Sequence, residues 1–396
     1  MNQIDISKAS LADLITVRDK RLEGVYSGKK VVPIAQFVED FIAERIDVNC
    51  DVQALLRQRT RFFDYSFIPH HYNFFFRKFI PSVTIHSKKQ DERIIRDHYD
   101  RGNDFFAGFL GDRMVYTSAF FKTGKENLET AQDQKMDLVC QKIQMEPGHR
   151  HLDIGCGWGT LVAHAAKYYG TDSTGVTIAQ AGADFGNQRI KDWGVSDRAR
   201  INRMDYRSIP QTKFDRITCL EMAEHVGVKY FTKFMKQINS LLTDDGLFFL
   251  QIAGLKAGLH KESMVWGLFM SEYIFPGADA SMPLSFVVKR LELAGFEVHS
   301  VENIGIHYSQ TIQLWYYNWL ENKESVVKAY GEWWYRLWAI FLGWSVDIAA
   351  QGNSTAFQIV CNKNLEQFNR RRWFAGVEMG ERDSIVQKRF SDPTLV

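Results

Sequence analysis

The sequence predicts an α/β protein in which helices wind around both faces of a parallel sheet. Between residues 127 and 253, strand-like and helix-like stretches alternate, which is the order expected of a doubly wound sheet. Within that region the segment 151–154, which reads as a short strand, leads into a turn with glycines at 155, 157 and 159. Junctions of this kind form ligand sites in open α/β sheets, so we expect the chain to be organised around this turn.

The first part of the chain, to about residue 60, is predicted to be helical and amphipathic. Ser10 is a candidate N-cap for a helix that begins at Leu11, and the segment 34–46 carries apolar residues at helical spacing between acidic ones. A charged run at 88–93 marks the expected boundary. We therefore expect a helical, aromatic-rich region over 1–90 and the main domain over 91–396.

The segment 61–83 combines aromatic with basic side chains. Its aromatic residues, followed by the basic residues in and beside it, are Phe62, Phe63, Tyr65, Phe67, Tyr72, Phe74, Phe75, Phe76, Phe79, Arg57, Arg59, Arg61, Arg77 and Lys78. Such a segment can lie on an anionic membrane surface, or its aromatic rings can pack on the main domain. Pro69 and Pro81 exclude one long amphipathic helix, and both interpretations stay open.

The alternating region is predicted in detail as follows. Strands are expected near 150–155, 172–178, 200–205, 214–220 and 246–253, and helices near 127–144, 160–169, 180–193 and 228–242. A later strand at 296–301 follows from the alternation of apolar and polar residues after Gly295. Because ligands of such sheets lie beyond the carboxyl ends of the strands, the residues that follow each strand are the candidates for a site.

Composition limits the classes of partner. The 49 basic and 47 acidic residues give a net charge of +2, which makes no case for nucleic acid binding. The five cysteines are far apart without a C-x-x-C pair, so we expect neither disulfides nor a metal site, and an intracellular location. No run approaches the roughly 20 apolar residues that span a bilayer. The aromatic content of 14% favours an apolar substrate tunnel or an interfacial surface.

The glycine turn is not of the type that binds a pyrophosphate. That fingerprint requires a third glycine three positions after the second, and Thr160 occupies this position. The alternating glycines are closer to the cofactor loop of S-adenosylmethionine methyltransferases, in which the turn passes the amino-acid part of the cofactor.

Blocks in a fixed order carry a wider resemblance. They are 98–106 (HYDRGNDFF), 114–121 (MVYTSAFF), the glycine turn 151–160 (HLDIGCGWGT) and 221–227 (EMAEHVG). Over about 95–320 the sequence resembles the cyclopropane-fatty-acid synthase family of S-adenosylmethionine-dependent methyltransferases. The segments 250–255 (LQIAGL), 273–277 (YIFPG) and 330–336 (YGEWWYR) resemble its sphingolipid C-9 methyltransferase branch. Fungal members of this branch carry membrane spans near the N-terminus and this sequence has none, which leaves the substrate open.

The resemblance implies a seven-stranded, Rossmann-like methyltransferase sheet, a lipid-facing insert after the fifth strand, and S-adenosylmethionine as cofactor. By position it assigns cofactor contacts to Tyr116, Thr117, Asp153, Gly155, Cys156, Gly157, Trp158, Gly159, Thr177, Asp205 and Tyr206.

The resemblance also implies a catalytic group. In the family, residues matching Glu224 and Tyr308 help to hold a bicarbonate ion that serves as the base, and His225 stands where substrate meets cofactor. Ser118 and Gln251 replace the usual cysteine and histidine ligands of that ion, and both can still hydrogen-bond an anion.

The expected activity is methylation of an alkene carbon in a lipid chain, with the sphingoid base of a ceramide or glucosylceramide preferred. An alkene is a poor nucleophile, so positioning supplies much of the acceleration, and aromatic faces can stabilise the resulting cation. Alternatives are a cyclopropane or methyl-branched fatty acyl phospholipid synthase, an amine N-methyltransferase of a small metabolite, and a non-catalytic cofactor-binding protein. We expect a lipid substrate and a peripheral position on a membrane, the endoplasmic reticulum for a sphingolipid. A homo-oligomer stays open.

Two late segments carry further expectations. Trp333, Trp334, Trp338 and Trp344, with Tyr335 and Arg336, form an aromatic cluster. We favour a tunnel wall or domain core for this cluster over an interfacial helix. The basic patch 369–374 suits an anionic head group or a solvated turn.

Overall fold

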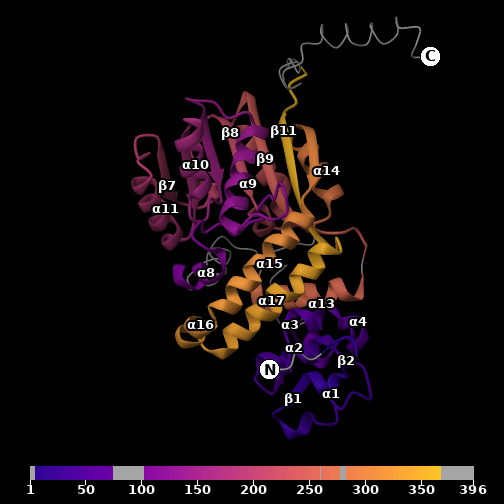
Figure 1. The fold of residues 1–396 in the computed structure, drawn as a ribbon. Coiled ribbons are helices and arrows are strands. Elements are labelled where there is room, and N and C mark those ends of the chain that lie inside the picture. Colours follow the sequence, from indigo (N-terminus) through magenta and orange to yellow (C-terminus); the bar gives the residue numbers. More distant parts are fainter. Residues whose placement is uncertain (1–4, 75–101, 259, 277–281, 367–396) are drawn as a thin grey trace, which may run out of the picture.

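The computed structural model describes residues 5–74, 102–258, 260–276 and 282–366. Figure 1 shows three tiers along the long axis of the molecule: the central sheet with its helices, a pair of long helices, and the N-terminal region at the opposite end from the sheet. The predicted boundary at 88–93 and the patch at 369–374 lie outside the described residues, as do 75–83 and 98–101.

The central sheet has seven strands in the order β10-β11-β9-β8-β5-β6-β7. Their bounds are β5 (Arg150–Ile154), β6 (Asp172–Thr177), β7 (Ala199–Arg203), β8 (Phe214–Leu220), β9 (Leu242–Leu255), β10 (Phe296–Asn303) and β11 (Ser354–Lys363). Strand β11 runs antiparallel to both of its neighbours, and β9, β8, β5, β6 and β7 are mutually parallel. The strand order reverses at β5, which pairs with both β6 and β8, and this switch point is where such sheets bind ligands.

Helices cover both faces of this sheet (Figure 1). They are α9 (Leu128–Lys142), α10 (Thr160–Tyr169) and α11 (Gln180–Asp192) on one face, and α12 (Val228–Leu241) and α14 (Leu284–Leu293) on the other. Side chains of β9 alternate between the two cores, since Leu247 and Phe249 pack with α9 and α10 whereas Phe248 and Leu250 pack with α12 and α14. The predicted doubly wound sheet is thus confirmed.

Two insertions interrupt the sheet topology. Between β10 and β11 the chain forms α15 (Gly305–Glu321), α16 (Lys323–Tyr330) and α17 (Glu332–Ala350), and between β9 and α14 it forms α13 (Lys261–Phe269) and the π-helix η5 (Met270–Ile274). Helices α15 and α17 lie side by side beneath the sheet (Figure 1). Trp338 and Trp344 on α17 are fully buried. The aromatic cluster of the sequence therefore belongs to a hydrophobic core, as favoured, rather than to an interfacial helix.

The N-terminal region contains more strand than the sequence predicts. Its elements are α1 (Leu11–Leu14), β1 (Ile15–Val17), η1 (Lys20–Leu22), β2 (Val32–Pro33), α2 (Ile34–Ile42), β3 (Ile46–Val48), α3 (Val52–Arg57), α4 (Arg59–Phe62), β4 (Phe63–Asp64) and α5 (Pro69–Phe74). Ser10 caps α1 as predicted, because the Asp13 carboxylate accepts from its backbone N–H and its hydroxyl. Helix α2 stops before Ile46 because Glu44 adopts a positive φ of 57°, which ends the helix and starts β3.

The N-terminal region packs on α17 through buried ion pairs. Arg59 is 2% exposed, and its guanidinium contacts Glu262 and Asp347. Arg336 of α17 donates to the backbone carbonyl oxygens of Phe41 and Ile46. Residues of this region also share one hydrophobic core with α8 (Asn103–Leu110), α15 and α17. The described N-terminal residues are therefore firmly joined to the helices beneath the sheet.

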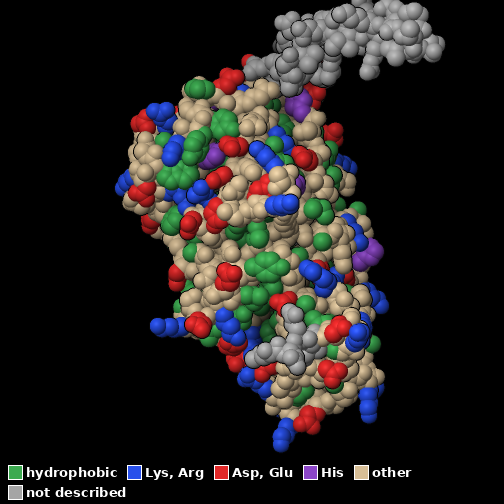
Figure 2. Space-filling view, in the orientation of Figure 1, with side chains coloured by type: hydrophobic (Ala, Val, Ile, Leu, Met, Phe, Trp, Pro, Cys, Tyr) green, Lys and Arg blue, Asp and Glu red, His purple; other side chains and the backbone are tan. Residues whose placement is uncertain are grey.

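The aromatic and basic segment divides between core and surface. Phe62, Phe63 and Phe74 are buried, whereas Phe67 and Tyr72 are 40% and 57% exposed. On the face seen in Figure 2, the described residues present basic and acidic side chains intermixed. In the described part of the chain, no helix has the length and apolar character needed to cross a bilayer.

Candidate active site

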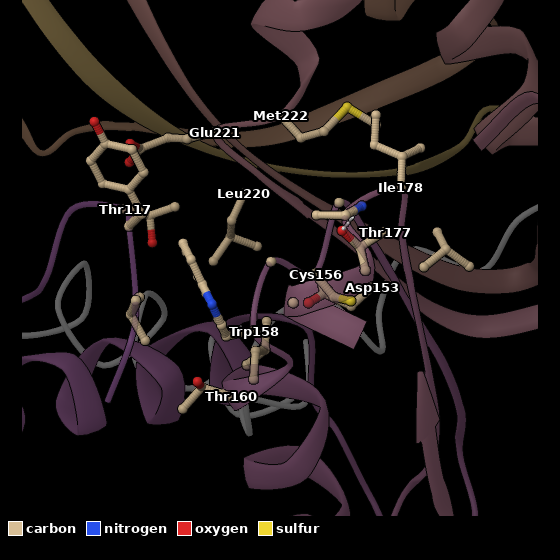
Figure 3. A pocket seen from close by; sticks show the side chains of 18 of the residues that line it. Thr117, Asp153, Cys156, Trp158, Thr160, Thr177, Ile178, Leu220, Glu221 and Met222 are labelled. Atoms are coloured by element: carbon tan, nitrogen blue, oxygen red, sulfur yellow. Dashed lines mark hydrogen bonds between the residues drawn. The ribbon is translucent and has the colours of Figure 1, made fainter. Parts of the chain in front are cut away.

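A pocket lies at the carboxyl ends of β5, β6, β7 and β8, where the strand order predicts a ligand (Figure 3). Every residue that the sequence assigned to the cofactor lines it, except Gly159. His225 also lines it, whereas the other candidate catalytic residues, Glu224, Tyr308, Ser118 and Gln251, do not. Glu221, which was assigned no role, does line the pocket, and Figure 3 shows it on the same side as Thr117.

The glycine turn between β5 and α10 requires glycine for backbone reasons. Gly155, Gly157 and Gly159 have φ angles of 79°, 54° and 72°, which side chains rarely tolerate. A Cβ on Gly159 would also lie 2.0 Å from Cδ1 of Ile201. Gly159 therefore shapes the turn without touching the ligand space. At Gly157 a Cβ would meet nothing within 4 Å, so this backbone is open towards the pocket at the start of α10.

At the end of β5, Asp153 is a buried carboxylate with one hydroxyl partner. The Thr218 hydroxyl donates to Asp153 Oδ1 over 2.6 Å, and the same oxygen of Thr218 lies 2.9 Å from His151 Nε2. Burial raises the pKa of Asp153 to about 6, against the hydrogen bond from Thr218 and the charge of Lys135, which lower it. The side chain is thus held in one position at the pocket wall.

Lys135 is a pocket residue that the sequence reasoning missed. It lies on the buried face of α9 and is 1% exposed, and its Nζ donates to Thr117 Oγ1 over 2.8 Å. Burial lowers its pKa to about 8, although the charges of Glu221 and Asp153 oppose this. A lysine at helical spacing between Ala131 and Val139, both fully buried, is the signal that could have found it.

The ends of β6 and β7 supply the polar wall on the other side. Thr177 ends β6, and Asp205 caps the 3-10 turn η3 (Tyr206–Ser208). The Asp205 carboxylate accepts from the backbone N–H and the guanidinium of Arg207 at 2.7–2.8 Å. Arg207 was also missed, although its place two residues after Asp205 is typical of a turn that an acidic side chain closes.

The end of β8 presents two acidic residues. Glu221 has a positive φ of 50°, which costs a non-glycine residue about 1 kcal/mol. Its Oε1 accepts from the backbone N–H of Ser118 over 2.9 Å and from Gln251 Nε2 over 2.6 Å. Burial raises the pKa of Glu221, and these two donors and the charge of Lys135 oppose the rise.

Glu224 follows in the 3-10 turn η4 (Ala223–Val226) and is 6% exposed. Its Oε1 accepts from the backbone N–H of Ala253, and its Oε2 has no hydrogen-bond partner among the described residues. Burial, and then the charge of Glu221, raise the pKa of Glu224 to about 8. Burial thus raises the pKa of both carboxyl groups, and the charge of Glu221 adds to the rise at Glu224.

The remaining candidates surround this acidic pair. Tyr308 lies on α15, and burial followed by the charge of Glu221 raises its pKa far above the ordinary value. The Ser118 hydroxyl donates to the carbonyl oxygen of Ala119. His225 faces the pocket, and burial lowers its pKa to about 4. A neutral imidazole at this position does not repel a cationic ligand.

Comparison with known proteins decides the family. The family model for mycolic acid cyclopropane synthetase matches residues 86–359. The chain belongs to this family. A sphingolipid C9-methyltransferase of Komagataella phaffii is 46% identical over 363 residues, which are 89% of this chain and 74% of that protein. Sphingolipid C9-methyltransferase A of Emericella nidulans is 46% identical over 350 residues, 87% of this chain and 68% of that one.

A solved relative supports the fold and the cofactor. The crystal structure of a mycolic acid cyclopropane synthase complexed with S-adenosylhomocysteine (SAH) and CTAB has a TM-score of 0.66 and 25% identity, and covers 71% of this chain and 100% of its own. This chain of the mycolic acid cyclopropane synthetase family is accordingly an S-adenosylmethionine-dependent methyltransferase with the seven-stranded fold expected of one.

The pocket residues fit S-adenosylmethionine. The open backbone at Gly157 leaves room for a ligand at the helix start, and Asp153, Asp205 and Glu221 all line the pocket. A sulfonium with an ammonium group is cationic, and buried carboxylates attract it strongly. When bound, the cofactor supplies an electrophilic methyl group, and the chain supplies the position and the charge around it.

The residues do not fit a bicarbonate ion in the same way. Of the two side chains expected to donate to it, the Ser118 hydroxyl donates to the carbonyl oxygen of Ala119 and the Gln251 amide donates to Glu221, which also accepts from the backbone N–H of Ser118. The Oε1 of Gln251 accepts from Gln358, so both ends of its amide already have a partner. An added anion would lie against the carboxylate of Glu221 without these donors, and we derive no step through it.

Proposed function

We propose that this methyltransferase transfers the methyl group of S-adenosylmethionine to C9 of the sphingoid base of a ceramide or glucosylceramide, where an alkene accepts it. The observation that carries the proposal is the 46% identity to sphingolipid C9-methyltransferases over 87–89% of this chain. The site supports it, because the buried acidic side chain of Glu221 at the pocket wall, with Glu224 behind it, and neutral aromatic side chains suit proton loss from a lipid cation.

The aromatic part of the wall begins at Tyr116. Its ring centroid lies 6.1 Å from that of Phe275 and 5.4 Å from that of Trp315. Phe275 in turn lies 6.2 Å from His225. These rings extend from the pocket towards the core formed by α8, α15 and α17. An apolar chain that reaches the methyl group along them would lose water and meet aromatic faces where positive charge develops.

Deuterium labelling tests the reaction and its product together. The chain would be expressed in a yeast whose sphingolipids lack the methyl branch and which is fed methionine with a CD₃ group. We expect a ceramide that retains three deuterium atoms, because a branch forms without loss from the new methyl. A cyclopropane would retain two, because ring closure removes a proton from that methyl. Label confined to phospholipid acyl chains, or in neither lipid, would contradict the proposal.

A matched variant separates catalysis from cofactor binding. We expect Glu224→Gln to remove labelled ceramide while the affinity for SAH, measured by calorimetry, changes by less than about threefold, since Glu224 does not line the pocket. Label at the wild-type level in this variant would exclude Glu224 from the reaction. Loss of SAH binding with retained heat stability would assign it to the cofactor.

We also propose that the protein works peripherally on a membrane, that of the endoplasmic reticulum for this substrate. Exposed Phe67 and Tyr72 lie on a segment rich in basic residues, which supports attachment. Flotation with ceramide-containing liposomes should carry the wild type upward, and less of a Phe67→Ser, Tyr72→Ser variant. Equal flotation of both would contradict a role for these rings. The homo-oligomer stays a prediction for sedimentation analysis.

A further inference from the structure

Glu221 occupies a backbone position that favours glycine. Its φ of 50° is left-handed, and its N–H donates to the carbonyl oxygen of Gln251 over 2.7 Å. Glycine would adopt this conformation without strain, so the backbone gives no reason for a glutamate here. The reason must lie in the side chain, which reaches the pocket wall and takes two hydrogen bonds there.

A directed chain of hydrogen bonds holds this carboxylate. Lys142 Nζ, which can only donate, lies 2.6 Å from Gln358 Oε1. This leaves the amide of Gln358 to donate to Gln251 Oε1 over 3.0 Å, and the amide of Gln251 to donate to Glu221 Oε1 over 2.6 Å. Gln251 and Gln358 are direct partners across β9 and β11. The orientation of both amides is therefore fixed by the lysine, and the last donor in the chain meets an acceptor.

The charged and titratable neighbours agree with an anion at Glu221. Lys135 of α9 attracts it, and Tyr308 of α15 and Glu224 of η4 respond to its charge. Burial and the charge of Glu221 raise the pKa of Glu224. Of the two carboxyl groups, that of Glu221 is the one that lines the pocket, and it lies within reach of the charge of Lys135.

We propose that the carboxylate of Glu221 is the base of the methyl transfer and takes the place that the family resemblance gave to a dissolved bicarbonate ion. This inference rests on the proposed alkene methylation. The π pair of the alkene forms the new C–C bond as the S–CH₃ bond breaks and its electrons stay on sulfur. After a hydride shift, a C–H pair of the lipid chain becomes the new double bond. The proton goes to a Glu221 oxygen, which later returns it to water.

Chemical rescue tests the role of Glu221. Glu221→Gly suits the backbone and removes the carboxylate, leaving the donors at Ser118 and Gln251 for a small anion. In buffers free of CO₂, we expect wild-type turnover to be independent of added bicarbonate. We expect the variant to lose at least about 100-fold in kcat, which is a typical contribution of a general base. Formate or bicarbonate at 20 mM should restore the variant at least about tenfold.

Anion binding gives a readout that does not need turnover. The ¹³C line width of labelled bicarbonate should broaden with Glu221→Gly and stay sharp with the wild type. Glu221→Gln, which fills the space without a base, is the matched control. It should bind SAH, give little turnover and show no rescue, because an amide leaves no cavity for the anion.

Each outcome of these experiments either supports or overturns the role of Glu221 as the base. Wild-type turnover that needs bicarbonate, bicarbonate broadening in the wild type, or full turnover of Glu221→Gly would overturn the inference. Broadening and rescue confined to Glu221→Gly would support it. If the wild type labels no alkene lipid, the proposed function fails. The bicarbonate signal then still reports whether Glu221 occupies the anion position.

Discussion

Gly182 offers a sharp test of how α11 positions the cofactor loop. This residue is in the first turn of α11, and a Cβ added to it would lie 2.7 Å from the carbonyl oxygen of Gly157. Ordinary contacts begin at 3.4 Å. In Gly182→Ala, either the helix or the loop must therefore move by about 0.7 Å, and no flexible side chain can absorb the shift, because the atom met is backbone.

The size of the effect follows from two opposed terms. Alanine gains about 1 kcal/mol over glycine in a helix, and overpacking in a tight interior costs about 1–3 kcal/mol. The net change in the free energy of unfolding should lie between zero and about −2 kcal/mol. The substitution should affect cofactor binding by the loop more than it affects stability. A displacement near 1 Å can cost about 100-fold when geometry is critical, so we expect SAH to bind about 10–100-fold more weakly.

The assay is calorimetric titration with SAH, with thermal unfolding measured alongside. Gly267→Ala in α13 is the matched control, since a Cβ there would meet nothing within 4 Å. It should bind SAH as the wild type does and unfold at an equal or higher temperature. Unchanged SAH affinity in Gly182→Ala would refute the argument that this backbone contact sets the position of the loop.

Three further perturbations have defined outcomes. Arg59→Met should lower the free energy of unfolding, measured in urea, by about 3–5 kcal/mol, because the carboxylates of Glu262 and Asp347 lose their buried cation. The control Arg57→Met changes a side chain that is 58% exposed and should lower it by less than about 1 kcal/mol. Thr218→Val should cost about 1–3 kcal/mol by leaving the carboxylate of Asp153 without its donor. Glu224 has a pKa of about 8 in the folded protein against 4.5 unfolded, so the folded form keeps its proton to a higher pH, and the contribution of Glu224 to stability falls as pH rises between these values. In that window the stability of Glu224→Gln relative to wild type should rise by up to about 1.4 kcal/mol per pH unit. A stability difference that stays constant from pH 5 to 8 would contradict this.

The sheet could be predicted from the sequence because each of its strands can be recognised from a short stretch of residues. The segments at 150–155, 172–178 and 214–220 are short strand-like stretches that alternate with helix-like ones, and they form β5, β6 and β8 to within one residue. The glycine turn could be predicted in the same way, because Gly155, Gly157 and Gly159 each allow the positive φ that the turn requires. The pocket residues Gly155, directly after β5, and Thr177, at the end of β6, were found for the same reason.

The acidic centre could not be predicted in this way because its contacts are distant in sequence. Ser118 and Glu221 are 103 residues apart, and Gln251 is 30 residues beyond Glu221. Only the packing of β8 and β9 and the return of the segment before α9 bring them together. Lys135 was missed for a related reason, since its role depends on which face of α9 meets the sheet. The two acids three residues apart after an apolar strand were a visible signal, but the sequence did not indicate which of them faces the pocket.

A base attached to the sheet has a consequence that a dissolved ion lacks. Glu221 directly follows β8, and β8 pairs directly with β5, with Thr218 opposite Asp153. The carboxylate and the glycine turn therefore follow neighbouring strands, and their separation is fixed by the hydrogen bonds of the sheet. A cyclopropane forms when the new methyl group loses a proton, whereas a methyl branch forms when, after a hydride shift, a carbon of the lipid chain loses one. With one fixed acceptor the ratio of these products should not respond to bicarbonate concentration, and the deuterium count of the labelled lipid should stay the same across buffers with and without CO₂.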